Sequence, residues 1–359
     1  MSGGLKIRQI QMRLEPQSVI GQERPVRRLT KMLEKRSIPH ALLFTGADGI
    51  GKQKTAKGLG MALNCLSPVG VWACGKCPSC QKVISGCHPD MITVKLEGSF
   101  IKIDQVREVS RQLRFAPLEG NWRIVIINDA QAMTLEASNA ILKILEEPPK
   151  GTVIILTAGQ TTDLLSTIVS RCQKIAFRPI PYEKVTKVLM EQKGLDRQMA
   201  TTLAVAVKGS LGKALSVDAE KWSVWRTNIL EQIASLSIKS VQPIFFFADV
   251  LARDKDKLVD ALDLILTWFR DVIMSKISPE RIINKDFMTK IEHASQGETI
   301  NELLEKVWSV YAAQTAISRN SNPRLVLEVM MMRLCLGCQA VTSQKVRGNF
   351  LKRSPLAGN

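Results

Sequence analysis

The stretch GADGIGKQKT, Gly46 to Thr55, decides the predicted fold of this chain. It follows the phosphate-binding loop pattern G-x-x-x-x-G-K-[ST] as far as Lys52, but Gln53 stands where a hydroxyl would hold magnesium. The preceding HALLFT, His40–Thr45, is a short apolar run typical of a buried strand, and the helix-forming sequence KQKTAKGLGMALNC follows the loop. A strand, a glycine loop and a helix in this order predict an α/β phosphate-loop domain.

Two further apolar runs, RIVIIN at Arg123–Asn128 and TVIILTA at Thr152–Ala158, are typical of buried strands. Between them, ASNAILKILEEPP predicts a helix that ends at Pro148 and Pro149. Alternating strands and helices favour a parallel sheet. We therefore assign residues 1–180 to one α/β domain.

The remainder of the chain has the pattern of helices. Short helical segments follow FRPIPYEK and predict a small helical lid over residues 181–218. Apolar residues at spacings of three and four then predict an all-helical domain over 219–345, and residues 346–359 form a basic tail. The apolar stripes that define this domain comprise Leu258, Leu262, Ile265, Phe269 and Val272, and then Leu327, Met331 and Leu334.

Composition restricts the class of protein. The chain has 359 residues, of which 45% are hydrophobic and 23% charged, as in ordinary globular proteins. No apolar run approaches the ~18 residues that cross a bilayer, and the N-terminus lacks a hydrophobic signal core, so we expect a cytoplasmic protein without a membrane contact. The formal net charge of +17 favours polyanionic partners, nucleic acid among them.

A cluster of cysteines in CLSPVGVWACGKCPSC has the spacing C-x8-C-x2-C-x2-C. Four thiolates at ~2.3 Å from one ion make a closed tetrahedral zinc site, which leaves no position for a reacting water and is therefore structural. Cys87 and His88 are alternatives for the fourth ligand, and unliganded thiols are the alternative to a metal site. Cys335 and Cys338 form a separate pair that we expect to lie buried in a helix. The predicted zinc ligands over residues 65–80 are Cys65, Cys74, Cys77 and Cys80.

Several segments resemble the clamp-loader subunits of bacterial DNA polymerase III, in particular the delta-prime family within the AAA+ superfamily. The resemblance runs over nearly the whole chain, and LKILEEPP followed by SRC is its most specific part. It implies an α/β ATPase-type domain, a three-helix lid and a helical collar domain for oligomerisation. The matching segments are VIGQERPVRRL, the phosphate loop, the cysteine cluster, CHPDMI, SNAILKILEEPPKGTVIILTA, SRC and SNPRLVLE.

Against this family pattern, the chain departs at three positions that hydrolysis of ATP needs. Gln53 replaces the magnesium-binding hydroxyl, and Asn128 occupies the place of the metal-binding aspartate, followed by Asp129 in the place of the catalytic glutamate. Magnesium prefers carboxylate and water to neutral amides. In the lid, Gly212 stands where an arginine is usual, although the adjacent Lys213 offers a partial substitute. Together these departures predict a subunit that does not hydrolyse ATP.

Nucleotide binding is a separate question from hydrolysis. Gly46, Gly49, Gly51 and Lys52 are all present, and a loop of this kind at a helix N-terminus holds phosphate without turnover. Bound ATP or ADP is therefore one expectation. A loop that now only connects a strand to a helix is the other, and the sequence favours neither.

The resemblance also implies a role for the SRC tripeptide. In this family its arginine, here Arg171, reaches into the ATP site of a neighbouring subunit, and Ser170 would help to position it. An arginine finger in trans stabilises charge on the transferring phosphoryl group and contributes ~10³-fold or more in rate. The alternative from spacing alone is a structural arginine at a helix C-terminus.

These observations predict a non-hydrolysing clamp-loader subunit of the replicative polymerase holoenzyme. Its implied partners are the ATPase motor subunits and delta in a ring, the sliding clamp and primer–template DNA. One alternative is an active ATPase motor subunit of the same assembly, which Gln53 and Asn128 argue against. Another is a zinc-dependent nucleic-acid-binding protein with a vestigial loop, which the shortage of aromatic residues around the cysteines disfavours.

Overall fold

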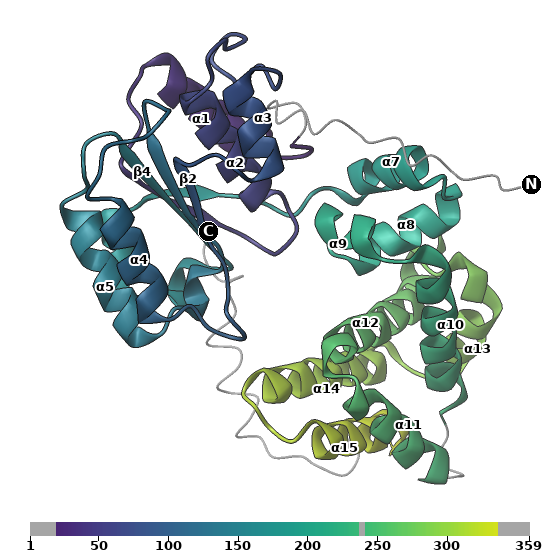
Figure 1. Cartoon of the computed structure of the whole chain (residues 1–359). Coiled ribbons are helices and arrows are strands. Elements are labelled where there is room, and N and C mark those ends of the chain that lie inside the picture. Colours follow the sequence, from purple (N-terminus) through teal and green to yellow (C-terminus); the bar gives the residue numbers. More distant parts are fainter. Residues whose placement is uncertain (1–18, 237–240, 337–359) are drawn as a thin grey trace, which may run out of the picture. The chain divides into compact units, whose positions relative to one another are not determined.

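The computed structural model of the chain describes residues 19–236 and 241–336, which belong to two compact units (Figure 1). The first unit runs to Ala200 and includes Val207–Ser216; the second comprises Thr201–Ala206 and the chain from Val217 onward. The boundaries given above for a separate lid and collar stay predictions. The predicted tail and Cys338 lie outside the described residues.

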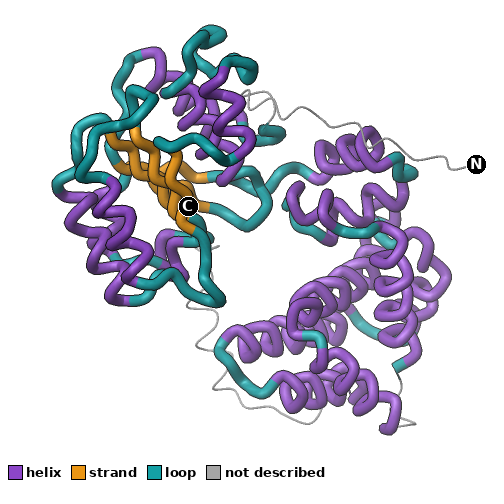
Figure 2. Tube along the Cα trace, in the orientation of Figure 1, coloured by secondary structure: helices purple, strands orange, loops and turns teal. Residues whose placement is uncertain are grey.

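The first unit is built on a parallel sheet, whose strands are orange in Figure 2. The sheet has five strands in the order β2-β3-β4-β1-β5. The three strands predicted from apolar runs are confirmed and occupy the middle of the sheet, whereas the two edge strands were not predicted. The strands are β1 (Ala41–Thr45), β2 (Met91–Val94), β3 (Arg123–Ile127), β4 (Thr152–Ala158) and β5 (Gln173–Ala176).

Helices cover both faces of this sheet, which explains why β3 and β4 are buried at every position (Figure 1). On one face, Leu42 and Ile126 pack with Leu29 and Leu59 of α1 and α2; on the other, Leu43 and its neighbours pack with α4 and α5. The helices of this α/β part are α1 (Glu23–Glu34), α2 (Lys52–Leu63), α3 (Pro78–Ser85), α4 (Ile103–Gln112), α5 (Leu135–Glu146) and α6 (Ser166–Arg171).

Three short helices follow the sheet within residues 181–218. They are α7 (Tyr182–Lys193), α8 (Arg197–Ala206) and α9 (Leu211–Ser216). Single-turn 3-10 helices also occur, at η2 (Ala130–Ala132), η3 (Thr161–Asp163), η4 (Pro279–Arg281) and η5 (Lys285–Phe287).

All regular secondary structure in the described part of the second unit is helical. The predicted apolar stripes form its core, with Leu262 and Ile265 fully buried. An ion pair between the buried Arg226 and the exposed Asp286, 2.7 Å apart, joins α10 to the segment before α13. None of the described helices is long and apolar enough to span a membrane. The helices are α10 (Ala219–Ser235), α11 (Val241–Arg253), α12 (Lys255–Ile277), α13 (Met288–Gln296), α14 (Ile300–Ser318) and α15 (Pro323–Leu336).

Candidate nucleotide site and cysteine cluster

The glycine loop connects β1 to α2 at the carboxyl end of the parallel strands, where ligands of such sheets bind. Gly46, Gly49 and Gly51 have φ angles of 140°, 72° and 106°, a region that residues with a side chain rarely adopt. A cavity of about 390 Å³ lies against the loop. Its lining combines the loop with an apolar wall and two carboxylates, and includes Val19, Ile20, Asp48, Lys52, Gln53, Asp129, Ile180, Leu211, Gly212 and Leu215.

Lys52 is buried and its ammonium group is occupied by the loop itself. The Nζ atom donates to the carbonyl oxygens of Gly46 and Ala47, the second at 3.0 Å, and lies 3.4 Å from the carboxylate of Asp48. In a working phosphate loop this lysine reaches the β- and γ-phosphates. Phosphate binding would therefore have to replace contacts that Lys52 already makes.

Helix α9 packs directly on the loop. The backbone N–H of Gly212 donates to the carbonyl oxygen of Gly49 at 2.8 Å. A Cβ atom at position 212 would lie 2.9 Å from the Cα of Gly49, closer than side-chain atoms normally come. The arginine that is usual at this position could not be placed here without moving α9 away from the loop.

The two positions expected to hold magnesium carry the neutral amide side chains of Gln53 and Asn128. Gln53 is exposed and lines the cavity. Asn128 is buried, and its Oδ1 atom has no hydrogen-bond partner among the described residues. Asp129 has a left-handed backbone with φ 51°, and its N–H donates to the Thr157 hydroxyl at 3.0 Å. Only Asp129 brings a carboxylate from the end of β3 to the cavity.

Arg171 closes α6 and is about one third exposed, so its guanidinium is accessible to solvent. It forms an ion pair with Glu146 at the end of α5, with an N–O distance of 2.6 Å, and donates to the carbonyl of Thr167 at 3.0 Å. The hydroxyl of Ser170 lies 3.5 Å from the Arg171 Nη1 atom. Cys172, the third residue of the tripeptide, is buried, and this burial raises the pKa of its thiol to about 11.

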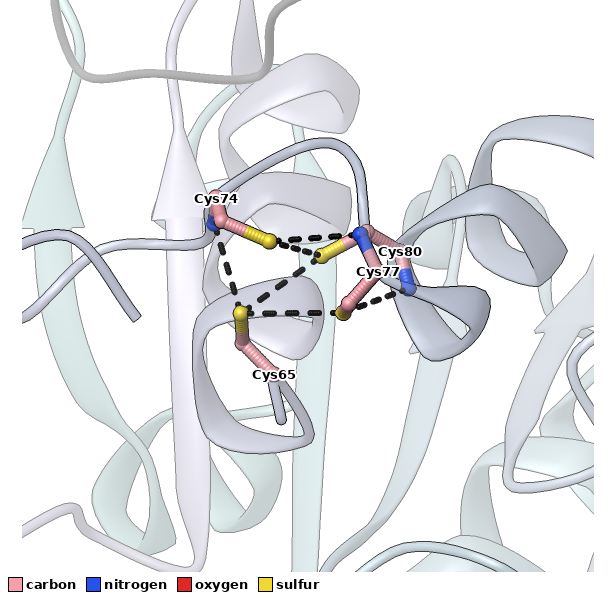
Figure 3. A group of neighbouring side chains, drawn as sticks. All are labelled: Cys65, Cys74, Cys77 and Cys80. Atoms are coloured by element: carbon pink, nitrogen blue, oxygen red, sulfur yellow. Dashed lines mark hydrogen bonds between the residues drawn. The ribbon is translucent and has the colours of Figure 1, made fainter. Parts of the chain in front are cut away.

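The predicted zinc ligands come together in space (Figure 3). The Sγ atoms of Cys65, Cys74, Cys77 and Cys80 all lie within 4.8 Å of one another. The separations are 3.9 Å for Cys65–Cys77, 3.9 Å for Cys74–Cys80 and 3.6 Å for Cys65–Cys80. Four sulfurs at ~2.3 Å from one ion in tetrahedral geometry would be about 3.8 Å apart, so the group can hold a metal ion.

The backbone around the cysteines is arranged to support thiolates. The N–H groups of Lys76 and Cys77 point at the Cys74 sulfur, at 3.5 and 3.3 Å, and lower the pKa of Cys74 to about 6. The segment from Cys65 to Cys80, which we call the knuckle, is anchored to α1, because the Trp72 indole donates to the Thr30 hydroxyl at 3.1 Å. A rigid frame of N–H donors is the usual surrounding of a structural metal site.

Neither alternative for the fourth ligand joins the group. Cys87 is exposed and is not one of the four clustered sulfurs. His88 is buried, with Nδ1 accepting from the Asp90 N–H at 3.1 Å and Nε2 3.2 Å from the Ser79 hydroxyl. Because both ring nitrogens are engaged, His88 supports the knuckle helix α3 and does not face the sulfurs. Cys65 is thus the fourth member of the cluster.

A buried ion pair in the same region was not predicted from the sequence. Asp90 is fully buried and lies 3.1 Å from the Arg123 guanidinium. Its carboxylate also accepts the backbone N–H groups of Leu118, Glu119 and Gly120 at 2.7 to 2.9 Å. Burial opposes ionisation, but these donors outweigh it and lower the pKa of Asp90. The only signal was Asp90 itself, a carboxylate within CHPDMI directly before an apolar run.

Comparison with known proteins places the chain among polymerase III subunits. A family model described as "DNA polymerase III, delta subunit" matches residues 21–181, and one described as "DNA polymerase III, delta subunit, C terminal" matches residues 220–335. The delta' subunit of DNA polymerase III from Bacillus subtilis is 29% identical over 318 residues, which are 87% of this chain and 96% of the relative.

Two further relatives match in part. The delta' subunit of Pseudomonas aeruginosa is 41% identical over 40% of this chain and 44% of its own length. The tau subunit of Bacillus subtilis is 26% identical over 89% of this chain and 61% of its own length. A solved structure of a gamma-subunit-related protein from Thermotoga maritima covers 86% of this chain and 97% of its own, at 19% identity and a TM-score of 0.43. A score of that size adds no weight, so the assignment depends on the sequence matches.

Proposed function

Because the chain belongs to the family of DNA polymerase III delta-prime clamp-loader subunits, we propose that it helps to load the sliding clamp without hydrolysing ATP itself. The family supports a role in clamp loading. The chain's own part would be to complete the ATP site of a neighbouring subunit. We expect it to act in the cytoplasm, in a complex with motor subunits and delta; the similarity to a tau subunit supports a complex of this kind.

The proposal that this chain does not hydrolyse ATP rests on the residues and contacts of its phosphate loop. Hydrolysis needs a magnesium ion held by a hydroxyl and a carboxylate, and the chain offers Gln53 and Asn128 at those places. Lys52 is bound to loop carbonyls, and Gly212 of α9 is hydrogen-bonded to Gly49. These contacts favour the second expectation for the loop, in which it connects β1 to α2 and holds α9 without nucleotide.

The surface position of Arg171 supports its role as an arginine finger in trans. Its guanidinium is anchored at one end by Glu146 and the Thr167 carbonyl, yet it remains partly exposed. Arginine has five donors, so these contacts leave N–H groups that can reach a phosphate on another subunit. Ser170 would restrict the Arg171 side chain, because its hydroxyl oxygen lies 3.5 Å from the Arg171 Nη1 atom.

We further propose that zinc occupies the four-cysteine cluster and stabilises the knuckle. Four sulfurs at tetrahedral spacing suit zinc, and a closed site of this kind has a structural role. Residues Cys65, Cys74, Cys77 and Cys80 would supply every ligand. The cluster has its own small apolar surroundings with Met61, Ala73 and Val83.

Clamp loading by the reconstituted complex tests this proposal. A fluorescent clamp would be loaded on primer–template DNA by complexes that contain the wild-type chain, Arg171→Ala or Arg178→Ala, an exposed arginine nearby that serves as the matched control. We expect Arg171→Ala to slow loading by ~10²-fold or more and Arg178→Ala to leave the rate within about twofold. Equal rates for all three complexes would contradict a trans-acting role.

A further inference from the structure

Helix α1 carries a straight row of positive side chains on its outer face. Arg24, Arg28, Lys31 and Lys35 follow each other at spacings of four, three and four residues, which keeps them within an arc of about 60° on a helix with 3.6 residues per turn. All four are exposed, whereas Leu29 on the opposite face is buried against the sheet. We name these four residues the basic ridge.

The basic ridge differs from other charged helices of the chain because its charges are not neutralised locally. Across residues 19–236 and 241–336, no acidic side chain lies within ion-pair distance of a ridge residue. On α4, in contrast, Arg107 pairs with Asp104 and Arg111 with Glu108, one turn away in each case. Glu23, at the start of α1, forms an ion pair with Lys184, with an N–O distance of 2.5 Å. A solvated helix face usually interleaves both signs, as α4 does.

The helix that carries the ridge is anchored to its surroundings. The Arg28 Nη1 atom donates to the carbonyl oxygen of Lys174 on the edge strand β5, at 2.8 Å. Thr30 accepts a hydrogen bond from Trp72 of the cysteine knuckle, and Leu29 packs in the core. Because the helix is anchored, the spacing of the four cations along it is preorganised for a regular array of anions.

We propose that the basic ridge binds the phosphate backbone of duplex DNA. From Arg24 to Lys35 the ridge extends about 16 Å, eleven residues at ~1.5 Å each. One strand of B-DNA presents a phosphate about every 3.4 Å along the axis, so four cations over this length face a continuous row of charges. Such contacts fix position without reading sequence. The choice of DNA as the polyanion rests on the proposed function, and an acidic protein surface is the competing partner.

The test is the salt dependence of DNA binding by the full chain. Binding to a fluorescent 30-base-pair duplex would be measured by anisotropy between 50 and 200 mM NaCl. The ridge variant is Arg24→Gln/Lys31→Gln/Lys35→Gln, which keeps the Arg28 bond to β5 and therefore the fold. The control, Lys82→Gln/Arg111→Gln/Lys187→Gln, removes three exposed cations that each pair with a glutamate. Thermal unfolding of each variant checks that it is folded.

Each phosphate contact contributes ~0.9 to the slope of log K against log salt, so the ridge variant should lose about 2.7 of that slope. Between 50 and 200 mM NaCl the wild type should then lose about 40-fold more affinity than the ridge variant, while the control keeps a slope close to that of the wild type. Equal slopes for wild type and ridge variant, or equal losses in both variants, would overturn the proposal. So would a ridge variant that binds DNA normally but fails to assemble with its partner subunits.

These results are separable from the proposed function. Clamp loading that depends on Arg171 together with an unchanged salt slope in the ridge variant would reject the ridge alone. A reduced slope in the ridge variant together with clamp loading that ignores Arg171 would reject the trans-acting role alone.

Discussion

Replacing Gly212 by alanine tests the contact between α9 and the phosphate loop. A Cβ at this position would lie 2.9 Å from the Cα and 3.1 Å from the carbonyl oxygen of Gly49, and both are backbone atoms that cannot rotate away. Overpacking of this kind costs ~1–3 kcal/mol, and the hydrogen bond from Gly212 to Gly49, worth ~0.5–1.5 kcal/mol, would be stretched. The higher helix propensity of alanine returns at most about 1 kcal/mol.

We therefore expect Gly212→Ala to weaken the contact by about 1–3 kcal/mol. Because this is a local contact, the change should appear as faster amide hydrogen exchange at Gly212 and along α9, roughly 5- to 160-fold, with a smaller effect on global unfolding. The rates would be measured by hydrogen–deuterium exchange on the full chain.

The matched control is Gly297→Ala, because Gly297 has open space where a Cβ would stand and a negative φ of −94°. That substitution should leave exchange in α9 unchanged. If Gly212→Ala and Gly297→Ala leave α9 equally protected, the close approach of α9 to the loop is not the contact argued here.

Other substitutions test the metal site and the missed ion pair. Cys65→Ser should abolish binding of one zinc ion per chain, measured by elemental analysis after purification, whereas Cys87→Ser should keep it; the reverse result would show that Cys65 is not a ligand. Asp90→Asn should cost about 3–5 kcal/mol of unfolding free energy at pH 7, because it leaves Arg123 buried without its partner charge. The pKa of Asp90 is lowered in the folded state, so this carboxylate stabilises the fold above its unfolded pKa of ~3.9. The loss of unfolding free energy in Asp90→Asn should therefore shrink as the pH falls below about 4. A loss that is constant from pH 7 to pH 3 would contradict this assignment.

How far the sequence predicts the sheet depends on burial. The central strands β1, β3 and β4 are covered on both faces, so each is a continuous apolar run that stands out in the sequence. The edge strands β2 and β5 are four residues long and only partly buried, and QKIA at β5 has a weak apolar pattern. Their pairing is decided by tertiary contacts, which no short window of sequence contains.

The same distinction applies to the sites. The spacing of the four cysteines predicts their cluster because the ligands lie close together in the chain and tetrahedral geometry restricts them. The contact of Gly212 with Gly49 joins segments far apart in sequence, and the turn of Lys52 toward loop carbonyls depends on the backbone path of the loop. From the sequence, Gly212 is a departure from the family pattern, whereas Gly49 and Lys52 are retained loop residues, and whether phosphate still binds stayed open.

The most direct test of the account is ATP turnover by the reconstituted complex in the presence of primer–template DNA. Complexes would contain the wild-type chain, Lys52→Ala or Arg171→Ala, and the isolated chain would be assayed alongside. The account predicts that the isolated chain is inert, that Lys52→Ala leaves turnover nearly unchanged, and that Arg171→Ala reduces DNA-stimulated turnover in the neighbouring site, by ~10³-fold there if the finger is fully used. Loss of turnover with Lys52→Ala and none with Arg171→Ala would contradict it and would make this chain an active motor subunit.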